Sequence, residues 1–297
     1  MSTVPLRFID AHHHLWDLNA CNYPWLMAKG EKRFFGDPAP IQKDYLVEDY
    51  SKESQLYLPE KSVHIQVGVA QTDALKESQW LQNQIDFPQA IVAFCDLSSK
   101  ELQADLEAQM QFSKLRGIRQ ILGRHEAEDG KHGSNSLLQN PTWLKGLKRL
   151  AKQNLSFDLQ MIPPQMPGVL EALKQVPHLN VALCHCGSPW DQSATGLASW
   201  RAGMAQLAEL PNVVCKISGL GMFNPQWKVE DLRPIILSSI DIFGPDRIMF
   251  GSNFPVDKLY RPYEELWSAY EEITADLSAQ EKQQTFYQTA NDFYQLG

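Results

Sequence analysis

Short hydrophobic, β-rich runs recur along the chain, with helix-like segments between them. Several runs are apolar almost throughout, such as AIVAFCDL and NVALCHCG. This is typical of strands in a parallel sheet that is covered on both faces. Eight such runs can be counted, at residues 8–13, 63–69, 90–97, 117–122, 156–162, 180–187, 213–220 and 248–255.

The segments between the runs carry helix start signals. Asn140 precedes Pro141 in NPTWLKGLKRLAKQ, and Ser278 with Glu281 forms a capping box. Strand and helix alternating eight times predict a (β/α)8 TIM barrel rather than an open sheet. No stretch has the composition of a linker, so we expect one domain over residues 1–297.

The regular spacing fails once, between residues 15 and 62, where nearly fifty residues separate the first two expected strands. Loops this long are usually functional. This one carries the aromatic stretches NYPWL and RFFGDP. We expect a lid over the top of the barrel, or a decorated loop that packs on its exterior.

Composition narrows the class of protein. The chain is 43% hydrophobic and 21% charged, with a net charge of −8 and no basic cluster, which argues against nucleic acid or an anionic membrane as a partner. Its five cysteines are sparse and odd in number, which argues against a disulfide framework. No apolar run reaches the roughly 18 to 20 residues of a membrane span, and no signal-peptide pattern precedes Phe8. We expect a cytoplasmic protein that acts on a small molecule.

Three consecutive histidines follow the first expected strand, in FIDAHHHLWDL. The chemistry of a parallel barrel lies at the carboxyl ends of its strands, where side chains alternate inward and outward. His12 and His14 therefore share a face and His13 points the other way. Two imidazoles at this spacing can hold one divalent ion, although histidines that cap a strand give the same pattern.

The sixth run adds a third histidine, because CHCG brings His185 to the same end of the barrel. Cys184 and Cys186 have the opposite parity. We expect these thiols to pack between sheet and helices rather than to bind metal.

Several motifs, in order along the whole chain, resemble the amidohydrolase-related lactonase family of the amidohydrolase superfamily: DAHHHLWDL…YPWL, ESQWL, GIRQIL, HCGSP, KISGL and FGSNFPVD, down to the closing TANDFYQL. That family includes hydrolases of sugar-acid lactones and of pyrone dicarboxylate. The resemblance implies that His12, His14, His185 and position 253 form the catalytic cluster. It also implies that Arg119 and Arg124 hold an acidic group of the substrate.

The chain departs from the family at the eighth strand, where GSNFP replaces the usual GSDWP and puts Asn253 in the place of a carboxylate. Asparagine has no useful proton chemistry near neutral pH. The position that supplies a bridging histidine in binuclear relatives also lacks one, because FDLQM offers Asp158 and Gln160. We therefore expect at most one divalent ion, a Zn²⁺ held by His12, His14 and His185, or catalysis without metal.

Two further charged side chains are candidates for substrate binding, each with a structural alternative. Asp257 in PVDKLY is a substitute base or a loop carboxylate that caps the next segment. Lys216 in CKISGL reaches a substrate carboxylate or oxyanion, or forms a structural ion pair. Arg119 and Arg124 form a local anion trap, unless they are solvated surface charges.

The sequence thus predicts a hydrolase that opens a small acidic or sugar-acid lactone by attack of water at the histidine cluster. A metal-dependent non-oxidative decarboxylase of the same superfamily is the first alternative, although such relatives depend more heavily on the missing aspartate. A catalytically silent barrel that binds a small acidic ligand is the second, and Asn253 is its main support.

Overall fold

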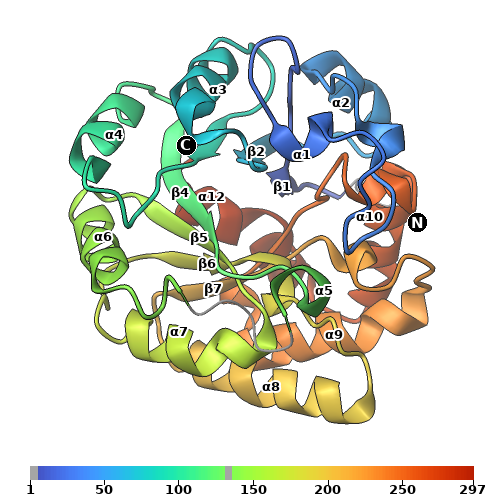
Figure 1. The fold of residues 1–297 in the computed structure, drawn as a ribbon. Coiled ribbons are helices and arrows are strands. Elements are labelled where there is room, and N and C mark those ends of the chain that lie inside the picture. Colours follow the sequence, from blue (N-terminus) through green and yellow to red (C-terminus); the bar gives the residue numbers. More distant parts are fainter. Residues whose placement is uncertain (1–5, 131–135) are drawn as a thin grey trace.

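The predicted strands form one parallel sheet that curves into a barrel (Figure 1). The computed structural model describes residues 6–130 and 136–297. The strands are β1 (Ile9–His13), β2 (Lys61–Ile65), β3 (Ala90–Ala93), β4 (Leu115–Ile121), β5 (Ser156–Gln160), β6 (Val181–Leu183), β7 (Val213–Ile217) and β8 (Ile248–Phe250). They pair in chain order, and beyond β8 the Asn253 N–H donates to the His12 carbonyl at 2.7 Å, which joins the last strand to the first. The (β/α)8 prediction is confirmed.

Helices surround the sheet. Those on the outside are α3 (Ala74–Gln82), α4 (Leu102–Gln109), α6 (Pro141–Lys152), α7 (Met166–Leu173), α8 (Ala194–Ala208), α9 (Val229–Phe243) and α10 (Tyr263–Ile273), followed by α11 (Ala279–Gln283) and α12 (Thr289–Phe293). The predicted caps of Asn140 and Ser278 are both present, since each side chain accepts a hydrogen bond from the backbone of its own helix. None of the helices in the described ranges is long and apolar enough to cross a membrane.

Two apolar layers make up the core. The outer layer lies between the sheet and the surrounding helices. The inner layer fills the barrel, where Ile9, Ala11 and Val63 pack with Tyr287 and Tyr294 from the end of the chain. The C-terminal residues thus close the end of the barrel that lies opposite the carboxyl ends of the strands.

An extra residue in β1 aims the first histidines. Asp10 pairs with Ser62 and His13 pairs with His64, so the chain advances by three residues in β1 over the length in which it advances by two in β2. Such a bulge changes which side chains point inward. Ile9 and Ala11 lie in the inner layer, yet His12 also faces the inside, because its ring lies 4.6 Å from that of His185.

Five strands, β2, β3, β6, β7 and β8, end three to five residues earlier than the hydrophobic runs predict, and two of these ends carry site residues. The run at 180–187 ends as a strand at Leu183, because His185 and Cys186 adopt left-handed backbone conformations with φ of 54° and 51°. The run at 248–255 ends at Phe250, and Asn253 also has a left-handed φ of 56°. Both left-handed turns follow strand ends that carry predicted site residues.

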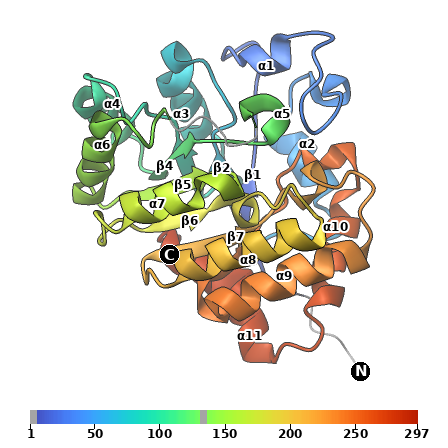
Figure 2. The same ribbon diagram turned by 60° about the horizontal axis from the view of Figure 1, so that its bottom comes forward.

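The long interval between β1 and β2 folds as a compact segment with two short helices, α1 (Pro24–Met27) and α2 (Val47–Glu53). An antiparallel bridge between Trp16 and Tyr45 ties it together. Figure 2 shows α1 at the same end of the barrel as α5 (Glu126–Asp129), the short helix after β4. This segment therefore stands beside the carboxyl ends of the strands.

Candidate active site

A pocket opens at the carboxyl ends of the strands, and five of the predicted site residues line it. They are His14, Arg119, Arg124, His185 and Asn253. The cavity volume is about 70 Å³, which suits a compact ligand.

Three imidazoles lie close together at this end of the barrel, and two of them, His14 and His185, line the pocket whereas His12 does not. The His12 ring centroid lies 5.1 Å from that of His14 and 4.6 Å from that of His185, and all three side chains are buried. His13 points away as predicted: its Nε2 lies 2.9 Å from the Ser62 hydroxyl, and its ring stacks on Tyr50.

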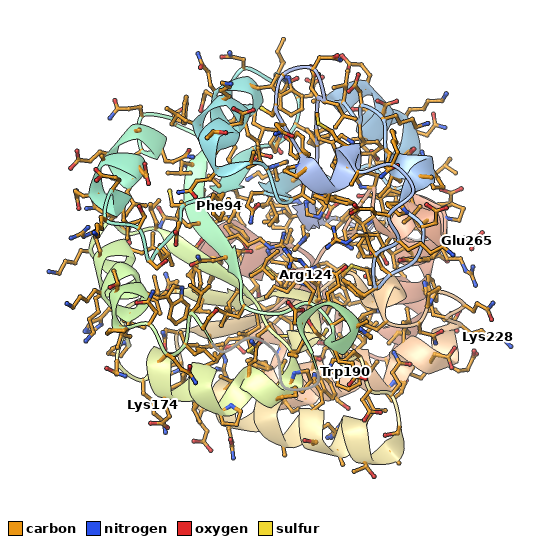
Figure 3. The ribbon with its side chains drawn as sticks, viewed as in Figure 1. Phe94, Arg124, Lys174, Trp190, Lys228 and Glu265 are labelled. Atoms are coloured by element: carbon orange, nitrogen blue, oxygen red, sulfur yellow. The ribbon has the colours of Figure 1, made fainter. Side chains whose placement is uncertain are left out.

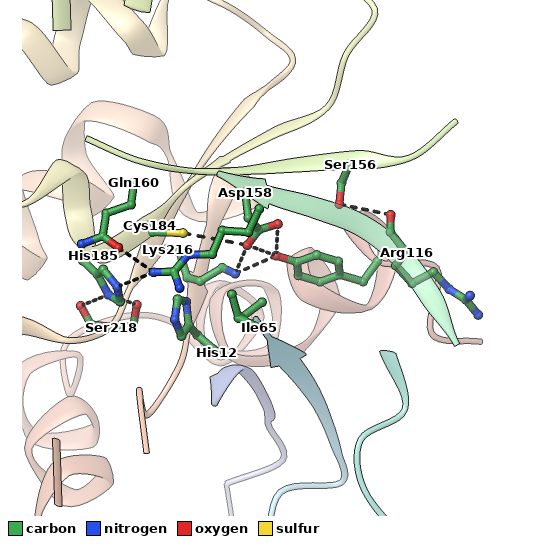
Figure 4. A network of polar contacts seen from close by, with 12 residues as sticks. His12, Ile65, Arg116, Ser156, Asp158, Gln160, Cys184, His185, Lys216 and Ser218 are labelled. Carbon is green, nitrogen blue, oxygen red and sulfur yellow. Dashed lines mark hydrogen bonds and ion pairs between the residues drawn. The ribbon is translucent and has the colours of Figure 1, made fainter. Parts of the chain in front are cut away.

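The loop after β7 holds the ring of His185 in place. Its Nδ1 lies 3.0 Å from the Ser218 hydroxyl and 3.2 Å from the Ser218 carbonyl oxygen (Figure 4). At Gly219 a Cβ atom would lie only 2.4 Å from this Nδ1, so glycine allows the ring to pack against the backbone. The loop after β7 therefore fixes the imidazole that follows β6.

Burial keeps these imidazoles neutral. It lowers the pKa of His14 to about 3, and the positive charge of Arg119 acts in the same direction. Burial, followed by neighbouring positive groups, also lowers the pKa values of His12 and His185 well below the usual range. Neither ring nitrogen of His12 has a hydrogen-bond partner among the described residues. The low pKa values mean that these imidazoles hold an added proton weakly, and in the neutral state each ring has one nitrogen lone pair that can accept a hydrogen bond.

Asn253 joins the cluster to a buried carboxylate. Its Oδ1 lies 3.1 Å from His14 Nε2, and its Nδ2 donates to Asp257 Oδ2 at 2.6 Å. Burial raises the pKa of Asp257 to about 7, against the effect of hydrogen bonds from Asn253 and the Gly221 N–H. The prediction that Asp257 binds substrate is not supported, because its carboxylate lies behind Asn253, away from the pocket surface.

Arg119 brings a positive charge to the histidines. Its Nη1 donates to the Gln66 carbonyl at 2.7 Å and its Nη2 to Gln160 Oε1 at 2.6 Å. Nη2 also lies 3.5 Å from His185 Nε2 (Figure 4). These hydrogen-bond partners are uncharged, so they do not neutralise the positive charge of this guanidinium beside the cluster.

Arg124 stands near the barrel axis in Figure 3. Its guanidinium lines the pocket, and no hydrogen bond or ion pair of that group is found within the described ranges. Burial lowers the pKa of Arg124, and nearby Glu128 opposes this effect. Arginine nevertheless remains charged in proteins. The two arginines thus both lie at the pocket, as predicted.

Lys216 requires a correction. Its Nζ donates to Asp158 Oδ2 at 2.5 Å and to the Tyr294 hydroxyl at 2.7 Å, and the side chain is fully buried inside the barrel (Figure 4). It does not line the pocket, because Asp158 and Tyr294 hold its ammonium group lower in the barrel. The structural ion pair was therefore the right alternative.

One cysteine also differs from its predicted position. Cys186 packs in the outer layer, as expected. The Sγ atom of Cys184 instead lies 3.9 Å from Asp158 Oδ2 in the barrel interior. Burial raises the pKa of Cys184 to about 11, so this thiol is protonated at neutral pH.

The sequence marked the long segment after β1 by its aromatic stretches NYPWL and RFFGDP, but it named no single residue there as part of the site. Trp25, Arg33, Phe34 and Phe35 all line the pocket. The aromatic stretch RFFGDP was a signal for this region, but nothing local distinguishes Arg33 from the neighbouring lysines. The segment reaches the pocket, and its movement as a lid stays a prediction.

The imidazoles as arranged do not fit a resident metal ion. Nε2 of His14 faces Asn253, and Nε2 of His185 faces the cation of Arg119. Within residues 6–130 and 136–297, no three His, Cys, Asp or Glu side chains are arranged to hold a metal.

Comparison with known proteins agrees with this architecture. The model of the amidohydrolase family matches residues 9–296. The uncharacterized protein y4mH of Sinorhizobium fredii is 39% identical, over 98% of this chain and 99% of its own length. An L-fucono-1,5-lactonase of Burkholderia multivorans is 30% identical, over 97% of this chain and 96% of its own length.

Among solved structures, an amidohydrolase from Burkholderia multivorans with bound zinc superimposes with a TM-score of 0.82 and 28% identity, over 98% of this chain and 100% of that one. Family match, fold and relatives confirm the resemblance seen in the motifs. The chain belongs to the amidohydrolase family and is a hydrolase of that superfamily.

Proposed function

We propose that the protein hydrolyses a small lactone that carries an acidic group. The observation that carries the proposal is the group of three neutral, buried imidazoles beside the fixed guanidinium of Arg119. The L-fucono-1,5-lactonase relatives support lactone hydrolysis as the reaction.

In the proposed reaction, a water oxygen attacks the lactone carbonyl carbon while an imidazole accepts the proton of the water. We assign this role to His12, because neither of its nitrogens has a partner among the described residues. Its ring lies beside those of His14 and His185, which line the pocket although His12 does not, and its lowered pKa makes it a weak base. Arg119 stabilises the negative charge that develops on the carbonyl oxygen. The ring C–O bond then breaks, and the imidazolium returns its proton to the leaving oxygen, which gives a hydroxy acid.

We assign no step to a metal ion, because His14 and His185 turn their Nε2 atoms to Asn253 and Arg119. The zinc in the Burkholderia structure belongs to that protein. Water activation by an imidazole typically contributes about 10²- to 10⁴-fold, and the lowered pKa of His12 places this site toward the lower end of that range.

The polar groups of the pocket favour an acidic substrate over a sugar lactone. No aspartate or glutamate lies among the pocket-lining residues of the described chain. Gln160 Oε1 already accepts a hydrogen bond from Arg119, and both the oxygen and the nitrogen of the Asn253 side-chain amide already have partners. Each sugar hydroxyl brings a donor that needs an acceptor, whereas a carboxylate needs only donors. Arg124 is the free donor that suits it.

The silent barrel remains the second candidate, because Asn253 removes the carboxylate that serves related enzymes. The decarboxylase alternative lacks that same carboxylate. A silent barrel predicts binding of a small acid without turnover.

The test is a panel of acidic and neutral lactones at neutral pH, with spontaneous hydrolysis subtracted. We expect turnover of an acidic lactone, and a loss of about 10²- to 10⁴-fold in His12→Ala and His185→Ala. His178→Ala is the matched control, because this histidine is exposed and lies outside the pocket. A wild type that binds small acids but turns over none of the panel would support the silent barrel instead.

A further inference from the structure

A small hairpin from the long segment after β1 reaches the pocket. Arg33 and Gly36 form an antiparallel bridge, with N···O distances of 2.8 and 2.9 Å, and place Phe34 and Phe35 at the tip. Gly36 has a φ of 115°, which few side chains tolerate. Arg33 and both phenylalanines line the pocket.

One carboxylate of α5 holds this hairpin from the other side of the pocket. Arg33 Nε and Nη2 donate to the two oxygens of Glu128, both at 2.7 Å. The backbone N–H of Phe34 donates to the same Oε1 at 3.2 Å. The exposed fractions of the Arg33 and Glu128 side chains are 18% and 20%, so solvent screens this two-point pair less than an ordinary surface pair.

Ring contacts reinforce the same junction. Phe34 lies parallel to His125, at 5.1 Å and 8°, and His125 immediately precedes α5. On its other side Phe34 stacks with Phe223, at 6.0 Å and 22°, in the loop after β7. The hairpin tip is thus inserted between the loops that follow β4 and β7.

The remaining contacts of the hairpin are mostly apolar. Residues 29–32 and 36–37 are exposed on both sides of the tip. Phe35 is buried, its carbonyl accepts a hydrogen bond from the Tyr260 hydroxyl at 2.8 Å, and its ring contacts Trp25 of the same segment. Glu128 therefore supplies the main polar attachment of the tip across the pocket.

We propose that Arg33 and Glu128 are positioning residues: their bridge closes the two-phenylalanine tip over the pocket and completes the wall against which the substrate packs. Substrate binding and bridge formation then favour one another, since both fix the same tip. The kinetic part of this inference rests on the proposed lactonase function. The structural part does not.

The test is a charge exchange. Arg33→Glu and Glu128→Arg each put like charges face to face, whereas the double variant rebuilds the pair in reverse. Arg233→Glu is the control, because it breaks an exposed pair with Glu272, at 3.3 Å, outside the pocket.

Closure can be measured without substrate, by cleavage with a protease specific for lysine. Lys29 lies in the exposed strip, and the residues on both sides of the bond after it are unchanged in every variant. Arg33 directly follows Lys32, so only cleavage after Lys29 is scored. Cleavage there follows the population of the open tip. We expect each single variant to be cut at least about tenfold faster than the wild type, and the double variant and Arg233→Glu to be cut at rates close to wild type.

Kinetics give the second readout. We expect KM for the acidic lactone to rise about tenfold in each single variant, with a smaller change in kcat, and to recover in the double variant. Equal cleavage of wild type and single variants would overturn the proposal. So would a double variant that regains protection but not KM, because Arg33 would then bind the substrate directly. If no lactone is turned over, the lactonase proposal fails while the cleavage result still decides the closure.

Discussion

Replacing Asn253 with aspartate places two carboxylates side by side in a buried site. Asn253 Nδ2 lies 2.6 Å from Asp257 Oδ2, and in Asn253→Asp an oxygen takes the place of that nitrogen. At an effective dielectric constant of about 20, two unit charges at this separation repel by about 6 kcal/mol. The pair therefore keeps one proton at neutral pH and titrates as a unit.

The effect on stability depends on pH. Burial raises the pKa of Asp257 to about 7 in the wild type. An acid whose pKa is raised by folding contributes stability below its unfolded pKa of about 4, and this is lost as pH rises through the folded value. The wild-type loss ends near pH 7. In Asn253→Asp the shared proton persists above pH 7, so the loss continues at about 1.4 kcal/mol per pH unit.

We therefore expect Asn253→Asp to lose about 3 kcal/mol of unfolding free energy between pH 7 and 9, relative to the wild type. Urea unfolding followed by tryptophan fluorescence at pH 5, 7 and 9 measures it, and the difference from wild type removes groups that the substitution leaves alone. The control is the exchange Asn253→Asp with Asp257→Asn, which keeps one carboxylate and one amide and should show no extra loss. The same pH dependence in single and exchanged variants would refute the reasoning.

Two further predictions concern buried charges, and a third concerns metal content. Burial raises the pKa of Glu77 to about 8, so the wild type loses stability as pH rises towards that value, whereas Glu77→Gln does not and still accepts the hydrogen bond from the Tyr23 hydroxyl. In urea unfolding, the free energy of unfolding of the variant should therefore rise by about 4 kcal/mol relative to the wild type between pH 5 and 8. A difference that does not change with pH contradicts this. Lys216→Met strands the Asp158 carboxylate and should cost about 3 to 5 kcal/mol, with a smaller loss when Asp158→Leu is added; equal losses in a thermal scan would argue against a coupled pair. Elemental analysis of protein purified without chelator should find no stoichiometric divalent ion, because His14 and His185 turn their Nε2 atoms to Asn253 and Arg119; one tightly held equivalent per chain would contradict this arrangement.

The barrel could be predicted because its signals are local. Strands buried on both faces are continuous apolar runs, and helix caps such as Asn140 and Ser278 mark helix starts within a few residues. The ends of β6 and β8 were predicted too late, because the residues after Leu183 and Phe250 remain buried although their backbone leaves the sheet. Hydrophobicity reports burial, and buried turns share it with strands.

The histidines were placed at the right end of the barrel, but the alternation argument explains only part of their position. The bulge in β1 allows His12 to face inward although Ala11 does so too. After β6, alternation would set Cys184 outside the barrel, yet its thiol lies near Asp158 inside. His185 reaches the pocket through its left-handed backbone. A bulge and a left-handed turn depend on neighbouring strands and loops, which the local pattern does not contain.

Ion pairs between residues far apart in the sequence were the hardest feature to predict. Arg33 and Glu128 lie 95 residues apart, and Lys216 and Asp158 lie 58 apart. A periodic pattern assigns each residue to a face of its own element, but it does not say which charge from another element will meet it. For Lys216 the sequence left two alternatives open, and only the approach of β5 and of the C-terminal residues decides between them.

The balance of charge in the barrel connects Asn253 with the proposed substrate. Lys216 is neutralised by Asp158 and Arg33 by Glu128, whereas Arg119 and Arg124 have no carboxylate partner among the described residues. A buried cation without a counter-charge is costly, so the buried Arg119, with the half-buried Arg124 beside it in the pocket, favours an anion. An aspartate at position 253 would neutralise part of this positive potential, and the amide leaves it in place. On the proposed function, an acidic substrate supplies in the complex the negative charge that position 253 lacks in the free protein.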